Sequence, residues 1–161
     1  MKREYIIPIL IFIPTLVVQL TVVPYISVDY FVPDLILALL VYFTLINGQM
    51  YGTVTGAIFG LIFDLVSGNL LGLSMFSKTI AGFTAGYFFN ENKIETNTSA
   101  INFALIVFLC AFLDSIFNGI FSDTQSVGII FIIFEKSLFP AIYTAIVSLL
   151  ITIGLPKRKF L

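Results

Sequence analysis

Apolar segments separated by short polar turns make up nearly the whole chain. Six of them can be outlined, over residues of about 5–26, 34–47, 51–66, 71–89, 98–119 and 127–155. Because a transmembrane helix needs about 20 apolar residues, segments of this kind are typical of membrane crossings. The pattern predicts an all-α integral membrane protein, a bundle of about six transmembrane helices that forms one domain over residues 1–161.

Residues typical of helix ends and turns mark the boundaries of these segments. Pro33 and Asp34 open the second segment, where the proline ring is preset for a first turn and the carboxylate favours the positive end of the helix dipole. The stretch from Asn47-Gly48 to Tyr51-Gly52 and the sequence Ser67-Gly68-Asn69 are predicted turns. Prolines inside the first and last segments predict kinks or breaks at Pro8, Pro14 and Pro140.

The second and third segments, at about 14 and 16 residues, are short for a crossing of about 20 residues. Two interpretations fit them. They are either two short crossings shielded by neighbouring helices, or a re-entrant hairpin that returns the chain to the side from which it came.

The basic residues outside the predicted helices indicate the orientation, because cytoplasmic loops carry an excess of Lys and Arg. In a six-crossing order they all fall on one side, at Lys2, Arg3, Lys93, Lys157, Arg158 and Lys159. The loops predicted on the opposite side, at about 27–33, 67–70 and 120–126, contain no Lys or Arg. Both termini are therefore predicted to be cytoplasmic.

Composition narrows the range of functions. The sequence contains no histidine, which excludes Ser-His-Asp triads and His-based zinc sites. Asp64 and Asp114 lie within apolar segments, as do the aspartates of intramembrane aspartyl proteases, but neither has the Gly-x-Gly-Asp setting of those enzymes. The formal net charge of −1 argues against a nucleic-acid partner. We expect a protein without catalytic residues, metal or cofactor, surrounded by the lipid bilayer.

Several polar side chains are predicted to lie in the outer half of the membrane. A charge inside a bilayer costs a few kcal/mol on insertion scales, so these residues need a reason to be there. We expect the lysines among them to compensate the carboxylates in an outward-facing cluster. Two interpretations stay open: a network that holds the helices together, or a contact surface for a partner or ligand. The predicted outer polar cluster consists of Gln19, Asp34, Asp114, Glu135 and Lys136, next to Asp64 and Lys78.

Small residues recur every fourth position on the third and fourth predicted helices, which places them on one face of each helix. If the two helices run antiparallel, glycines would let their backbones approach closely. We expect Gly52 to meet Gly86, and Asp64 to form an ion pair with Lys78 at the outer end. The predicted docking face consists of Gly52, Gly56, Gly60, Asp64, Lys78, Gly82 and Gly86.

The order of elements forms a recognisable pattern: a first helix, then PDLILALLVYF, then the glycine-spaced GTVTGAIFGLIFDLVSGNLLG, a short outer turn and a fourth helix. In this pattern the chain resembles the rod shape-determining MreD family. The resemblance covers most of the chain and is sharpest between Pro33 and Gly72, where Gly56-x3-Gly60-Leu61-x2-Asp64 is the most specific run.

This resemblance implies a non-enzymatic, multi-pass scaffold in the bacterial inner (cytoplasmic) membrane. Members of the family associate with MreC, a protein with one membrane helix. Together they link cytoplasmic MreB filaments to the RodA glycosyltransferase and its penicillin-binding transpeptidase partner. We expect the docking face and the outer polar cluster to form a groove for the membrane segment of MreC, with Asp64 and Lys78 fixing its register.

A second class of protein fits the pattern as an alternative. The substrate-binding membrane subunits of energy-coupling-factor transporters also have about six helices, and an outward polar cleft would suit ligand capture. Those subunits typically carry alanines spaced four apart on the first helix to dock the coupling subunit. The first helix here, IIPILIFIPTLVVQL, has none, which favours the scaffold.

Overall fold

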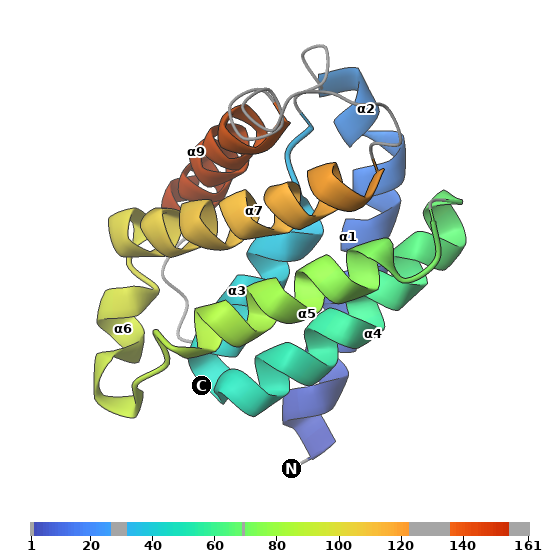
Figure 1. The fold of residues 1–161 in the computed structure, drawn as a ribbon. Coiled ribbons are helices and arrows are strands. Elements are labelled where there is room, and N and C mark those ends of the chain that lie inside the picture. The colour runs from blue at the N-terminus through green and yellow to red at the C-terminus, as the bar shows by residue number, and fades with distance from the viewer. Residues whose placement is uncertain (1, 27–31, 69, 123–135, 155–161) are drawn as a thin grey trace.

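The computed structural model describes residues 2–26, 32–68, 70–122 and 136–154, and over these residues all regular structure is helical. Six longer helices and three short ones follow one another along the described chain (Figure 1). They are α1 (Lys2–Thr21), α2 (Val23–Ile26), α3 (Leu35–Asn47), α4 (Gln49–Ser67), α5 (Leu73–Gly86), the 3₁₀ helix η1 (Glu91–Lys93), α6 (Ile94–Asn97), α7 (Ala100–Ser122) and α9 (Phe139–Gly154).

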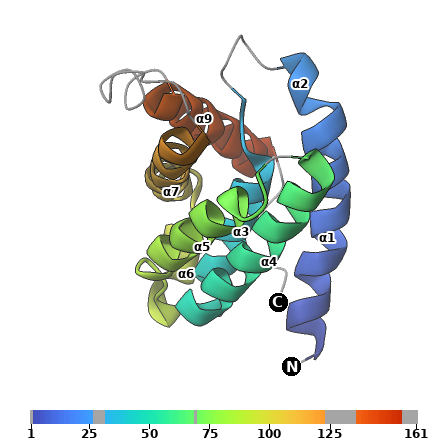
Figure 2. The same cartoon turned by 45° about the vertical axis from the view of Figure 1, so that its right-hand side comes forward.

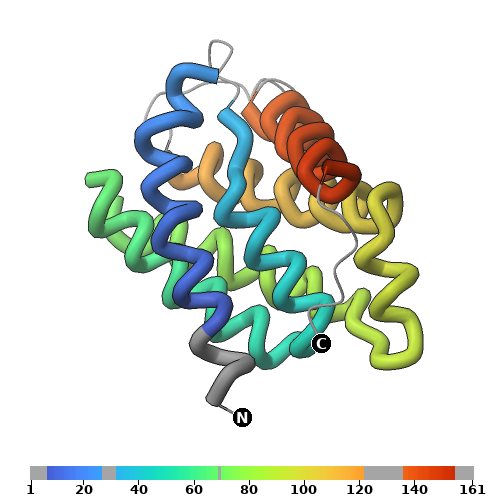
Figure 3. Tube along the Cα trace, turned by 180° about the vertical axis from the view of Figure 1, so that it is seen from behind, coloured from blue at the N-terminus to red at the C-terminus, as the bar shows by residue number. Residues whose placement is uncertain are grey.

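The longer helices run back and forth, so that their connections gather at two ends of the bundle. The α3–α4 turn and the connection from α5 through α6 to α7 lie at the end where α1 begins, and the α4–α5 turn lies at the other end (Figure 1). The helix α1 flanks the bundle (Figure 2) and runs beside α3 when seen from behind (Figure 3). The most extensive contact between two helices joins α4 and α5.

The short helix α3 is the centre of the fold. It contacts α1, α4, α5, α7 and α9, and Leu37, Leu40 and Val41 on it are fully buried. The main core lies between α3, α5, α7 and α9 and includes the free thiol of Cys110. The interpretation of the second segment as a short crossing requires neighbouring helices that shield it. The five helices in contact with α3 provide this shielding.

The helix bounds agree with the predicted segments to within a few residues for α3, α4, α5 and α7. The turn predicted from Asn47-Gly48 to Tyr51-Gly52 is shorter in the structure, where α4 already begins at Gln49. Gly48 alone joins α3 to α4, with a φ of 95° that favours glycine. The first segment is divided at Val22, where Pro24 lacks the amide hydrogen that would continue the helix.

The last predicted segment is described only from Lys136 onward; residues 123–135 lie outside the described part of the chain. Residues 136–138 form a π-helical turn that leads into α9. Pro140 lies in the first turn of α9 and cannot donate a backbone hydrogen bond to residue 136, which is the position expected for a break.

Within the described part of the chain, three helices are long and apolar enough to cross a membrane, over Gln49–Ser67, Ala100–Phe121 and Lys136–Gly154. The shorter stretches Ile7–Thr21 and Leu35–Asn47 are also apolar. Large apolar side chains on the outer surface, such as Leu10, Val54 and Leu105, are more than half exposed. An apolar exterior of this kind is the surface expected of a protein in lipid.

Candidate functional site

Glycines bring the backbones of α4 and α5 into direct contact. A methyl group placed on Gly56 would overlap the carbonyl oxygen of Lys78, and one on Gly60 would lie 2.7 Å from the amide nitrogen of Met75. Gly52 and Gly82 lie against each other in the same way. No side chain larger than hydrogen fits at these positions, so the predicted close packing of the two helices is confirmed.

The register of this hairpin differs from the predicted one by one helical turn. Gly52 faces Gly82 rather than Gly86, and Gly86 lies against Gln49. A repeat of four residues allows both alignments, because sliding one helix by a turn again places small residues opposite each other. In the observed register, Asp64 lies next to the amino-terminal end of α5.

Asp64 therefore caps α5 instead of pairing with Lys78. Its Oδ2 accepts hydrogen bonds from the amides of Gly72 (3.0 Å) and Met75 (3.2 Å), and its Oδ1 accepts one from Ser74 (3.1 Å). The N-cap residue Gly72 has no side chain to do this. A carboxylate at the amino end of a helix satisfies free amides and suits the dipole. The expected Asp64–Lys78 ion pair is wrong for this reason.

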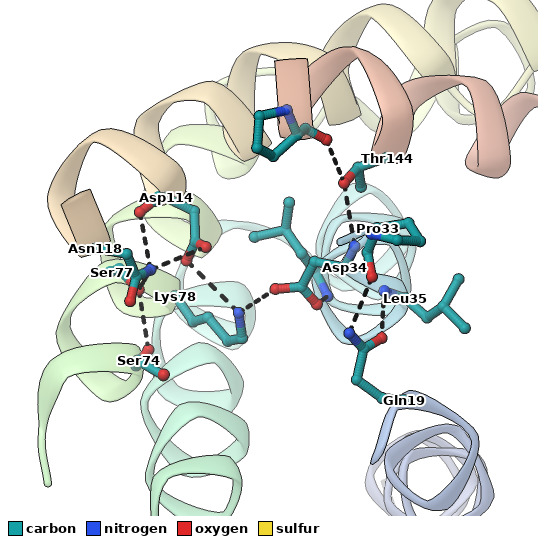
Figure 4. Close-up of polar contacts among 12 residues, drawn as sticks. Gln19, Pro33, Asp34, Leu35, Ser74, Ser77, Lys78, Asp114, Asn118 and Thr144 are labelled. Atoms are coloured by element: carbon teal, nitrogen blue, oxygen red, sulfur yellow. Dashed lines mark hydrogen bonds and ion pairs between the residues drawn. The ribbon is translucent and has the colours of Figure 1, made fainter. Parts of the chain in front are cut away.

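Lys78 instead lies between two other carboxylates (Figure 4). Its Nζ forms an ion pair with Asp34 Oδ2 and a second one, at 3.6 Å, with Asp114 Oδ1. The ring of Phe63 lies 5.7 Å from the same nitrogen. Lys78 is only 2% exposed. We call these three charged residues, which come from the start of α3, from α5 and from α7, the ion cluster.

Hydrogen bonds hold Asp34 in place from two further helices (Figure 4). Its Oδ1 accepts a hydrogen bond from the amide of Leu37 (2.8 Å), so Asp34 is the N-cap of α3 at the predicted helix opening. Its own amide donates to Thr144 Oγ1 on α9 (3.1 Å). Gln19 on α1 donates to the carbonyl of Pro33 and accepts from the amide of Leu35, both at 2.9 Å. The extended backbone before α3 is thus clamped from both sides.

Asp114 has fewer partners. Its Oδ2 accepts a hydrogen bond from Asn118 Nδ2 at 3.2 Å, and the same amide group donates to Ser77 Oγ on α5 at 2.9 Å. Within the described residues, Asp114 Oδ1 accepts no hydrogen bond although it is buried. The Asn118 amide therefore links α7 to α5 beside the ion cluster.

Four of the predicted polar residues meet at this site: Gln19, Asp34, Lys78 and Asp114. Lys136 is half-buried at the start of the turn leading to α9, and among the described residues it forms no ion pair with the ion cluster. Glu135 lies outside the described residues.

Sequence reasoning missed Ser77, Asn118 and Thr144, which join the same network. Asn118 could have been found, because it lies four residues after Asp114 on one helix face. Ser77 directly precedes Lys78 in the sequence. Thr144 lies in an apolar run, where nothing in the sequence indicates a polar contact.

The ion cluster joins helices and offers no recognisable catalytic set. Over the described residues there is no group of three His, Cys, Asp or Glu side chains that could hold a metal ion. The glycines of the predicted docking face are buried between α4 and α5. A partner helix could reach them only if these two helices separated.

A family model described as rod shape-determining protein MreD matches residues 2–158, which is nearly the whole of the 161-residue chain. No curated protein and no solved structure matches significantly.

Proposed function

Because this chain belongs to the MreD family of rod shape-determining membrane proteins, we propose that it is a non-enzymatic scaffold subunit of the bacterial cell-elongation complex. The family match over residues 2–158 is the observation that carries the proposal. The fold is compatible with it, since the described polar side chains of the site bind one another and the helix ends. A scaffold needs such rigidity more than it needs reactive groups.

In this proposal the protein binds MreC, and through MreC or directly it binds RodA and the penicillin-binding transpeptidase. MreB filaments are coupled indirectly, so that the position of filaments guides peptidoglycan synthesis and cell shape. These partners follow from family membership.

We also propose that the protein crosses the inner membrane six times, with both termini in the cytoplasm. The gathering of helix connections at two ends of the bundle supports an even number of crossings. The end that holds the start of α1 also holds η1 with Lys93, and basic residues favour the cytoplasmic side.

The candidate site serves partner binding indirectly in this proposal. The glycines of the docking face hold α4 and α5 together as a rigid pair, and the ion cluster fixes this pair to α3 and α7. MreC would then bind an outer surface of the assembled bundle rather than a groove lined by Gly56 or Lys78. Polar contacts between membrane helices contribute only about 0.6–2 kcal/mol each, so removing one should weaken the complex without abolishing it.

Affinity purification of the tagged protein from native membranes in mild detergent tests the proposal. Stoichiometric recovery of MreC, with RodA and its transpeptidase, is the expected result, and an unrelated multi-pass protein with the same tag is the control. Recovery of a pair of ATPases and a coupling membrane subunit would overturn the proposal in favour of a transporter subunit.

A further inference from the structure

The ion cluster contains one more carboxylate than it has cations. Asp34 and Asp114 share the single ammonium of Lys78. Of the described helices packed against α7, α3 and α9 contain no charged residue within their bounds, α5 contains Lys78, and α6 contains Glu95 at the opposite end of α7. Lys136, which precedes α9, forms no ion pair with either aspartate. With all three groups ionised, the cluster would carry a charge of −1 inside the bundle.

The two carboxylates are not equivalent. Asp34 has the closer contact with Lys78, caps α3 through the amide of Leu37, and has a side chain that is 24% exposed. The side chain of Asp114 is only 9% exposed. Its Oδ1 lies 3.6 Å from Lys78 Nζ, which is too long for a hydrogen bond, and it accepts no hydrogen bond from the described residues. The excess negative charge therefore falls on the less stabilised group, Asp114.

From this geometry we propose that the ion cluster is a proton-binding site, in which one proton taken from water is held on Asp114 Oδ1. Asp34 and Lys78 then form a neutral ion pair, and Asp114 is a neutral carboxylic acid. The step is a simple protonation of a carboxylate, with no other bond made or broken. The proposal goes beyond the scaffold function and does not depend on it.

A proton fits the site better than another cation does. A metal ion would need several oxygen ligands around it, and the position between the carboxylates is already filled by the Lys78 ammonium (Figure 4). A basic side chain from a partner would have to reach an oxygen atom that is enclosed by protein. A proton needs only the free lone pair of Asp114 Oδ1.

Infrared spectroscopy of the purified full chain in lipid nanodiscs at neutral pH tests the proposal by counting charges. A protonated carboxyl group has a carbonyl band separate from that of a carboxylate. We expect one equivalent of this band to be lost in Asp114→Asn. It should also be lost in Asp34→Asn, because Asp114 and Lys78 then form a neutral pair. In Lys78→Met the cluster needs two protons, so one further equivalent should appear.

Glu91→Gln, which changes an exposed carboxylate far from the cluster, is the matched control and should leave the band unchanged. Size-exclusion chromatography and circular dichroism identify the variants that remain folded. The wild-type protein labelled with ¹³C-aspartate gives a second measurement that needs no variant, because the band must shift if an aspartate holds the proton.

Three results would overturn the proposal: no label-shifted band in the wild type, an unchanged band in folded Asp114→Asn, or a band that persists in folded Asp34→Asn. The first two would indicate that a bound cation, or a charge from elsewhere in the chain, compensates the cluster. None of these results depends on MreC, so they leave the scaffold proposal to its own test.

Discussion

Gly56 on α4 and Lys78 on α5 are in direct backbone contact, with no space for a side chain between them. The same lysine sends its ammonium in the other direction, to Asp34 and Asp114. Lys78 therefore belongs to both parts of the candidate site: its backbone closes the hairpin, and its side chain ties the hairpin to α3 and α7.

Gly56→Leu should separate α4 from α5, because the new side chain would overlap the carbonyl group of Lys78. Overpacking of a core typically costs about 1–3 kcal/mol, and a forced backbone shift places this variant at the upper end or above. Thermal denaturation in detergent and the monodisperse fraction in size-exclusion chromatography measure the loss. Val54→Leu, on the exposed face of the same helix, is the control. Equal stability of the two variants would contradict the close-packing assignment.

Asp64→Ala should fray the start of α5 by removing the acceptor of three amides. Loss of a helix cap typically costs about 0.5–2 kcal/mol. We expect faster hydrogen–deuterium exchange over residues 72–75, with a smaller effect in Asp64→Asn, which keeps one acceptor oxygen. Exchange that is unchanged in Asp64→Ala would show that the amides find other partners.

Lys78→Met should leave the carboxyl groups of Asp34 and Asp114 without the cation that lies between them. Breaking a buried ion pair by removing one partner typically costs about 3–5 kcal/mol. Adding Asp34→Asn to Lys78→Met should recover part of this loss, since it removes one of the two carboxyl groups that have lost their cation. A double-mutant cycle of melting temperatures measures this coupling, and strictly additive effects would argue against the ion pair.

Gln19→Leu should loosen α1 from the start of α3, because it removes both hydrogen bonds that clamp Pro33 and Leu35. Each hydrogen bond contributes about 0.5–1.5 kcal/mol, so a loss of about 1–3 kcal/mol is expected. Thermal melting measures it, and Val18→Leu, on a neighbouring exposed position, is the control. A Gln19→Leu melting curve that matches the control would show that the clamp contributes nothing.

Local patterns predicted α3, α4, α5 and α7 to within a few residues, but they did not predict the short helices α2, η1 and α6. The helix opening at Asp34 and the glycine packing of α4 on α5 follow from residue types at fixed spacing. The register of the hairpin does not, because a four-residue repeat looks the same after a slide of one turn. The observed alignment is the one that places Asp64 on the free amides of α5, a detail of the turn that the repeat does not contain.

The partners of Lys78 were also beyond the sequence pattern. The sequence predicts that several charged residues lie at similar depths in the outer half of the membrane. It does not indicate which of the helices that carry them are neighbours. The choice between Asp64 and the pair Asp34 and Asp114 depends on the packing of α3 and α7 against α5. The same reason explains why Thr144, in an apolar stretch of α9, was not recognised as a partner of Asp34.

The wide separation of the ion cluster along the chain has a consequence for biosynthesis. Asp34 emerges from the ribosome 44 residues before the lysine that neutralises it. In the proposed membrane topology, the carboxylate of Asp34 therefore has no cation beside it until α5 has been synthesised. Asp114 is synthesised last of the three, so α7 adds a second carboxyl group to a site that already has its cation.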